Sequence, residues 1–255
     1  MLKRWLILPF VALMIIFMSM GCDEEPAASI DPPSALQLAG ATNETDLVLT
    51  WSASPEADID GYRVYFGTTE LGTVTATTYN HVGPTALGTY KVVAYKDEEE
   101  SAEITASTAL ATGTGEIYDL DAPVGDNSGY GWNWSTGVGT SYSGALTSPD
   151  YQSIDIYYDT DGTITSGSIR WTGGNVTGLQ QTADTYDNIG NADLTGYTDY
   201  ADVGLNQVYL IVIKKTYTDQ WSYMKLRIDA TASSPYNKIN FTYGYQKVKN
   251  FSLLD

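Results

Sequence analysis

Residues 46–51, Asp-Leu-Val-Leu-Thr-Trp, place a large apolar side chain at every second position and end on a tryptophan. Leu47, Leu49 and Trp51 therefore lie on one side of an extended chain, which is the pattern of a half-buried β-strand. Residues 61–67, Gly-Tyr-Arg-Val-Tyr-Phe-Gly, repeat the alternation after an acidic turn. Two such strands in succession predict an antiparallel sheet with one face packed on a core.

The alternation continues on both sides of these strands, at residues 36–38 and 87–95. Together with Trp51 and Tyr90, the short strands resemble a bacterial fibronectin type III domain over residues 31–112. The resemblance implies an Ig-like sandwich without a disulfide, in which Tyr90 occupies the tyrosine corner. It also implies a spacer or adhesion module that carries no catalytic residues.

Residues 116–255 form a second region, which the small residues 113–115 separate from the first as a linker, and 15 of the 20 tyrosines lie in it. Residues 208–213 are apolar on both faces, which predicts a strand that is covered on both sides. No stretch shows the period of an amphipathic helix, so we predict an all-β protein. We expect an Ig-like fibronectin type III sandwich, then a second antiparallel β-sandwich or flattened barrel. The expected strands of the second region are residues 116–119, 153–158, 163–171, 207–216, 221–228 and 238–246.

The last three of these strands resemble the C-terminal strands of HmuY-like lipoproteins, which are β-rich envelope proteins, some of which bind haem. The resemblance implies that residues 116–255 are an envelope β domain with a ligand. It argues less for haem itself, because this region has no histidine and its one methionine, Met224, alternates toward the core. We therefore expect neither haem nor another resident cofactor.

Residues 1–21 have the composition of a lipoprotein export signal. A basic pair precedes an apolar run that is shorter than the roughly 20 residues of a membrane-spanning helix. Ser-Met-Gly-Cys at 19–22 resembles the bacterial lipobox, which implies acylation of Cys22; an ordinary secretory signal is the alternative. Residues 22–30 follow as an acidic tether, similar to the export signal of surface lipoproteins. We expect a lipid-anchored protein of the cell envelope, at the outer membrane or the cell surface.

Charge and motif content exclude several functions. The chain has 13 basic and 31 acidic side chains, and a net charge of −18 argues against nucleic acid as a partner. The only histidine, His81, lies in a turn-rich stretch, where we expect an exposed loop residue. No nucleophile elbow, phosphate loop or His-Glu-x-x-His motif is present, so we expect no enzymatic activity. The expected partners are the lipid membrane, through Cys22, and a polysaccharide or an envelope protein.

Tyr130, Trp132 and Trp134 alternate along residues 129–135, so one face of a strand would carry three aromatic rings. If that face is exposed, the rings form a platform that stacks on the pyranose rings of a polysaccharide. If it is buried, the same residues are core, since large aromatic residues are also strong β-formers. The pattern is compatible with both interpretations.

Two acidic stretches invite a metal interpretation. Asp159-Thr160-Asp161-Gly162 has the spacing of a calcium turn, but the later glutamate of an EF-hand is missing. Calcium at Asp159 and Asp161 and a simple hairpin turn are therefore both open. Residues 96–100, Lys-Asp-Glu-Glu-Glu, are expected to be a solvated hairpin loop, because consecutive carboxylates cannot all face one ion.

Overall fold

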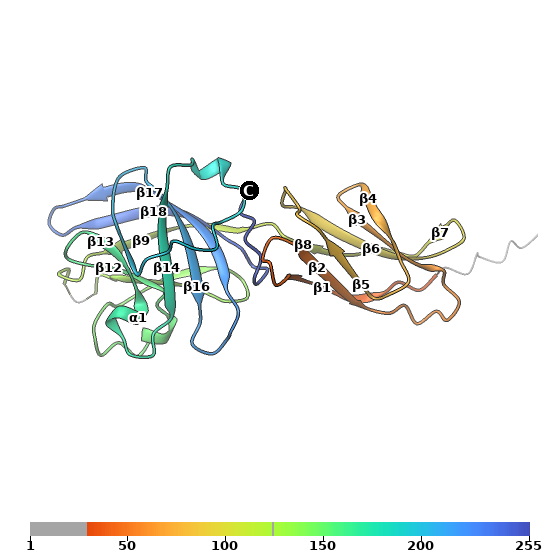
Figure 1. The fold of residues 1–255 in the computed structure, drawn as a ribbon. Coiled ribbons are helices and arrows are strands. Elements are labelled where there is room, and N and C mark those ends of the chain that lie inside the picture. The colour runs from red at the N-terminus through yellow and green to blue at the C-terminus, as the bar shows by residue number, and fades with distance from the viewer. Residues whose placement is uncertain (1–29, 124) are drawn as a thin grey trace, which may run out of the picture.

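The structure is a computed structural model that describes residues 30–123 and 125–255. It is built almost entirely from antiparallel β-sheets, which confirms the all-β prediction (Figure 1). The export signal, Cys22 and nearly all of the tether lie outside the described residues. No helix in the described part of the chain has the length and apolarity needed to cross a membrane.

The N-terminal unit packs a three-stranded sheet against a larger one. Leu47, Leu49 and Trp51 from the first sheet meet Tyr62 and Val64 from the second in a buried core. The expected strands at 46–51, 61–67 and 87–95 thus form β2, β3 and β6. The first sheet has the order β1 (Ser34–Gly40), β2 (Leu47–Ser52), β5 (Thr78–His81). The second has the order β4 (Thr69–Val74), β3 (Gly61–Phe66), β6 (Thr89–Lys96), β7 (Glu99–Glu100), and β8 (Ile104–Ser107) also pairs with β6.

His81 is not the exposed loop residue that the sequence predicted. It ends strand β5, pairs with Leu47 across the sheet and is half-buried. Its Nδ1 lies 2.7 Å from the hydroxyl of the fully buried Tyr90, and burial lowers the pKa of the imidazole. The Gly-Pro sequence after His81 predicted a loop. The structure instead has a short strand there, and its alternate residues Tyr79 and His81 face inward.

The C-terminal unit is a sandwich of two five-stranded sheets. Its core lies between their inner faces and is rich in aromatic and β-branched side chains. One sheet has the order β11 (Gly139–Tyr142), β10 (Gly129–Trp132), β12 (Ile156–Tyr158), β13 (Thr163–Ser166), β15 (Tyr200–Asp202). The other has the order β14 (Val176–Thr182), β16 (Val208–Lys214), β17 (Ser222–Ala232), β18 (Lys238–Tyr245), β9 (Ala111–Tyr118).

Strand β16 is covered on both faces, as its uninterrupted apolar sequence predicts. Tyr209 and Ile211 point into the core between the sheets, while Leu210 lies on the outer face against Ile189 and Leu254. In the neighbouring β17, Met224 is fully buried in the same core, as the alternation predicts.

Residues 113–115 are not a linker but the middle of β9. A Cβ on Gly113 would lie 2.5 Å from the Tyr243 hydroxyl, and one on Gly115 would lie 2.3 Å from the Phe241 ring. The glycines therefore make room for aromatic rings rather than breaking the chain. The expected strand at 163–171 is also shorter than predicted, since β13 ends at Ser166 and the short helix α1 (Gly167–Arg170) follows.

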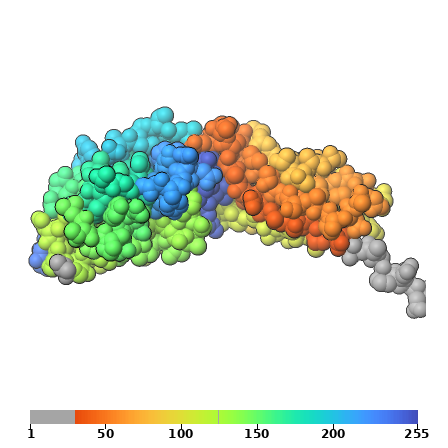
Figure 2. Space-filling view, turned by 90° about the horizontal axis from the view of Figure 1, so that it is seen from below, coloured from red at the N-terminus to blue at the C-terminus, as the bar shows by residue number. Residues whose placement is uncertain are grey.

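The C-terminal segment, residues 246–254, returns to the N-terminal unit. Val248 and Phe251 are buried in that unit's core, although they come from the far end of the chain. The Gly40 amide donates to the Lys249 carbonyl oxygen at 2.8 Å, and the Ser252 amide donates to the Glu44 carbonyl oxygen at 2.9 Å. The segment thus lies between the two units (Figure 1), which together form an elongated molecule with a shallow bend (Figure 2).

Candidate functional site

The structure divides the expected aromatic platform into core and surface. Tyr130 and Trp132 are 4% and 2% exposed, and their rings pack against Phe241 and Tyr243 with centroids 5.0 and 5.6 Å apart. For these two residues the core interpretation is therefore the correct one. Trp134 lies beyond the end of β10, where the alternation stops, and stays partly accessible.

A cleft of about 340 Å³ opens beside Trp134, and we call it the Trp134 cleft. Three segments meet there: the β10–β11 hairpin, the 3-10 turn η1 (Tyr151–Ser153) and the loop that follows β16. The most exposed aromatic side chain at its rim is Tyr217, at 70%. The residues that line it are Trp132, Asn133, Trp134, Thr136, Val138, Thr140, Tyr142, Gln152, Ser153, Lys215 and Tyr217.

The hairpin turn that carries Trp134 is fixed by its own side chains. Asn133 Oδ1 accepts hydrogen bonds from the amides of Ser135 and Thr136, at 3.0 and 2.9 Å. Gly137 has a φ of +71°, a conformation that favours glycine. An asparagine and a glycine at these positions are local turn signals, so the sequence does specify the connection that lifts Trp134 out of the strand.

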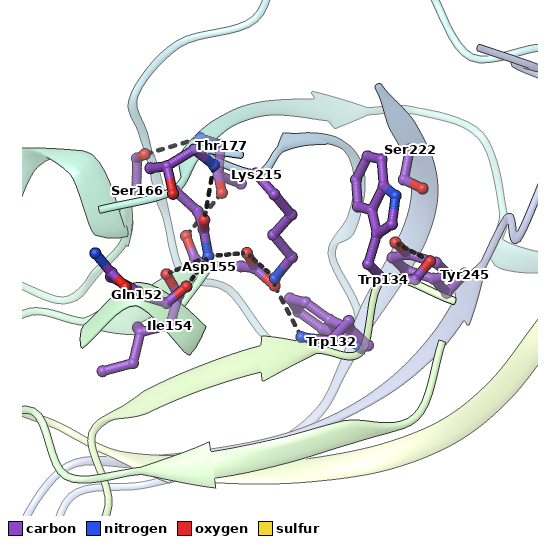
Figure 3. Close-up of polar contacts among 12 residues, drawn as sticks. Trp132, Trp134, Gln152, Ile154, Asp155, Ser166, Thr177, Lys215, Ser222 and Tyr245 are labelled. Atoms are coloured by element: carbon purple, nitrogen blue, oxygen red, sulfur yellow. Dashed lines mark hydrogen bonds and ion pairs between the residues drawn. The ribbon is translucent and has the colours of Figure 1, made fainter. Parts of the chain in front are cut away.

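A buried ion pair lies at the base of the cleft (Figure 3). Both carboxylate oxygens of Asp155 accept hydrogen bonds from Lys215 Nζ, each at 2.7 Å, and Asp155 is fully buried. Oδ2 also accepts from the Trp132 amide at 2.8 Å. Burial raises the pKa of the Asp155 carboxyl, and the charge of Lys215 and its hydrogen bonds oppose that rise. We did not predict this pair, although an aspartate between two isoleucines was a visible signal.

Asn175 and Thr177 complete the network around Asp155. The Asn175 amide group donates to Asp155 Oδ1 at 3.0 Å and to the Gln152 carbonyl at 2.7 Å. Thr177 Oγ1 donates to the Asp155 carbonyl oxygen at 2.7 Å. Because the network reaches both Gln152 and Lys215, it fixes two sides of the cleft relative to each other.

A second lysine lies behind Trp134. Lys249 Nζ is 4.1 Å from the centre of the Trp134 ring and 4.8 Å from that of Tyr245, a cation–π arrangement. It also donates to Ser222 Oγ at 2.6 Å and to the Tyr245 hydroxyl at 3.2 Å. Burial, with a contribution from the charge of Lys215, lowers the pKa of Lys249 to about 7. Lys249 therefore supports the ring that forms one wall of the cleft.

Asp159 and Asp161 lie in the turn between β12 and β13, away from this cleft. Asp159 Oδ1 accepts from the Thr160 amide at 2.7 Å, and Asp161 Oδ1 accepts from the amide and hydroxyl of Thr163 at 3.1 and 2.7 Å. These contacts stabilise a hairpin turn. Within residues 30–123 and 125–255, no group of three or more His, Cys, Asp or Glu side chains is placed to hold a metal ion.

Comparison with known proteins gives no family. Neither a family model nor a curated protein matches the sequence. Solved structures do match, among them one from work on the "promiscuous specificity of the carbohydrate-binding modules from the beta-sandwich super family". It is 11% identical, with 86% of this chain and 93% of that chain covered and a TM-score of 0.26. At that score the likeness carries no argument about function, and the resemblances to fibronectin type III and HmuY-like proteins stay predictions.

Proposed function

We propose that this protein is a non-catalytic carbohydrate-binding protein and that the Trp134 cleft is its binding site. The observation that carries the proposal is the composition of the cleft. Accessible rings of Trp134, Tyr142 and Tyr217 stand beside the amides of Asn133 and Gln152. Aromatic faces stack on the apolar faces of sugar rings, while amides and hydroxyls bind the sugar hydroxyls.

The same lining favours binding over hydrolysis. Most glycoside hydrolases use two carboxyl groups, one on either side of the scissile bond. Among the described residues that line the cleft, none is an aspartate or glutamate. Asp155, which contacts the lining residues Lys215 and Trp132, is fully buried, and Lys215 donates to both of its carboxylate oxygens.

The sequence also supports a proposal for the place of this site in the cell. We propose that acylated Cys22 anchors the chain in the envelope and that the N-terminal unit, as a fibronectin type III spacer, holds the binding unit away from the membrane. The support is the lipobox-like stretch at 19–22 and the acidic residues after it. Mass spectrometry of the mature N-terminus tests the anchor: a diacylglyceryl-modified Cys22 is expected, and an unmodified N-terminus elsewhere contradicts it.

Affinity electrophoresis of the full chain in gels that contain soluble polysaccharides tests the binding function. Retardation by at least one polysaccharide is expected, with loss of retardation in Tyr217→Ala. Tyr200→Ala is the matched control, because Tyr200 is 60% exposed but lies outside the cleft on β15. Retardation that survives Tyr217→Ala places the sugar elsewhere, and no retardation by any polysaccharide argues for a protein partner instead.

A further inference from the structure

The side chains that line the Trp134 cleft differ in charge from the protein as a whole. The chain carries 31 acidic and 13 basic side chains, yet among the described residues that line the cleft the only charged one is Lys215. A second cleft, beside β9, is lined by both Glu116 and Asp126. Acidic residues are therefore available to line clefts in this fold, and the Trp134 cleft lacks them among its described lining residues.

Lys215 keeps hydrogen-bonding capacity toward a ligand. An ammonium group has three N–H donors, and its two contacts with Asp155 do not use all three. The Lys215 side chain is 4% exposed, and that small accessible part lies in the lining of the cleft. The network around Asp155 holds that ammonium in place, so a ligand does not have to order it on binding. Preorganised donors of this kind contribute more to affinity than mobile surface lysines do.

Lys249 adds a second positive charge on the far side of Trp134. Its ammonium is 4.1 Å from the centre of the ring. Around Trp134, the charges are thus the two ammonium groups of Lys215 and Lys249 and the single carboxylate of Asp155. The base of the cleft therefore has a net positive charge when Lys249 is protonated. An anion that stacks on the open face of Trp134 is attracted by this charge, and a neutral ligand is not.

We infer that the Trp134 cleft selects acidic sugars, with a hexuronate ring stacked on Trp134 and Tyr217 and its carboxylate held by Lys215. This inference rests on the proposed function and deepens it, since it names the class of sugar. A carboxylate fits because it accepts from Lys215 and balances the charge of Lys249. Neutral hexoses would leave that charge without a counterion.

Titration calorimetry of the full chain with uronate oligosaccharides and their carboxyl-reduced forms tests the inference. The probes are oligomers of galacturonate, glucuronate and alginate, each paired with the neutral oligomer made by reducing its carboxyl groups, at pH 6. At least one acidic oligomer is expected to bind at least tenfold more tightly than its reduced form, with affinity that falls as NaCl is raised. Lys249→Met should weaken this binding several-fold. Lys247→Met, which removes the same charge outside the cleft, should not.

The outcomes separate this inference from the function on which it rests. Equal or tighter binding of the reduced oligomers, lost in Tyr217→Ala, overturns the acidic preference and leaves carbohydrate binding in place. Binding of acidic oligomers that Lys249→Met and Lys247→Met weaken equally also overturns it, because general charge then explains the effect. The absence of binding to acidic and reduced oligomers alike, together with no retardation by any polysaccharide, overturns both.

Discussion

Lys249 contacts the Trp134 ring with its side chain and the N-terminal unit with its backbone. The ammonium lies 4.1 Å from the centre of the ring, while the carbonyl oxygen accepts the amide of Gly40 at 2.8 Å. One residue therefore connects a wall of the proposed binding site with the packing of the two units.

Stability should rise with pH above neutrality because of Lys249. Burial lowers its pKa to about 7, against 10.5 for the ordinary side chain. Between these values the unfolded chain binds the extra proton, so raising the pH favours the folded state, by at most about 1.4 kcal/mol per pH unit. Below pH 7 both states are protonated and the residue contributes no slope. Urea unfolding at pH 7.5 and 9 should show a steeper rise for the native chain than for Lys249→Met, and equal slopes would contradict this.

The Asp155–Lys215 pair should behave as one unit in a double-mutant cycle. Asp155→Asn leaves a buried lysine without its counter-charge, and Lys215→Met leaves a buried carboxylate, so each should cost about 3–5 kcal/mol. The double variant should cost clearly less than the sum. Glu103→Gln, in the exposed pair with Lys91, is the control and should change the unfolding free energy by less than about 1 kcal/mol. Additive costs for the buried pair would show that the two side chains act independently.

Replacing Trp132 by alanine should destabilise the protein, whereas replacing Tyr217 should not. Trp132 is 2% exposed and packed in the core, so Trp132→Ala should cost about 3–5 kcal/mol. Tyr217 is 70% exposed, and its replacement by alanine should leave the thermal midpoint within experimental error. Differential scanning calorimetry of both variants measures this. An unchanged thermal midpoint for Trp132→Ala would contradict the assignment of Trp132 to the core.

Gly40 should be a sensitive position at the junction of the two units. A Cβ there would lie 1.5 Å from the carbonyl oxygen of Asn250, so Gly40→Ala must displace the C-terminal segment. We expect a loss of about 1–3 kcal/mol in the free energy of unfolding, as for other overpacked sites. Gly190→Ala is the control, because nothing lies within 4 Å of its Cβ position. Equal stability of the two variants in denaturant melts would show that the C-terminal segment shifts to accommodate the added methyl group without loss of stability.

The strands were predictable where each depends on a local pattern. The alternation of Leu47, Leu49 and Trp51 specifies β2, and the two-faced apolar run at 208–213 specifies β16. Local patterns failed where a distant partner decides the conformation. Gly113 and Gly115 lie in a strand because the rings of β18 and β10 fill the space above them, and no short window contains that information.

The candidate site could be predicted only in part. Trp134 was identified, but its separation from Tyr130 and Trp132 depends on where β10 ends, which is set by pairing with β11. Lys215, Lys249 and Tyr217 come from the β16–β17 loop and the C-terminal segment, and only the folded chain brings them together around Trp134. The residues of the cleft are far apart in sequence, so spacing alone could not have found it.

The C-terminal segment also determines when, during synthesis, the core of the first unit can be completed. Phe251 and Val248 complete the core of the first unit, but they leave the ribosome roughly 140 residues after that unit ends, about 7 to 28 s later at 5–20 residues per second. Until then the core of the first unit lacks these two side chains. For a chain that is exported as we propose, this delay is useful, because a polypeptide must stay unfolded while it is threaded through a translocation channel.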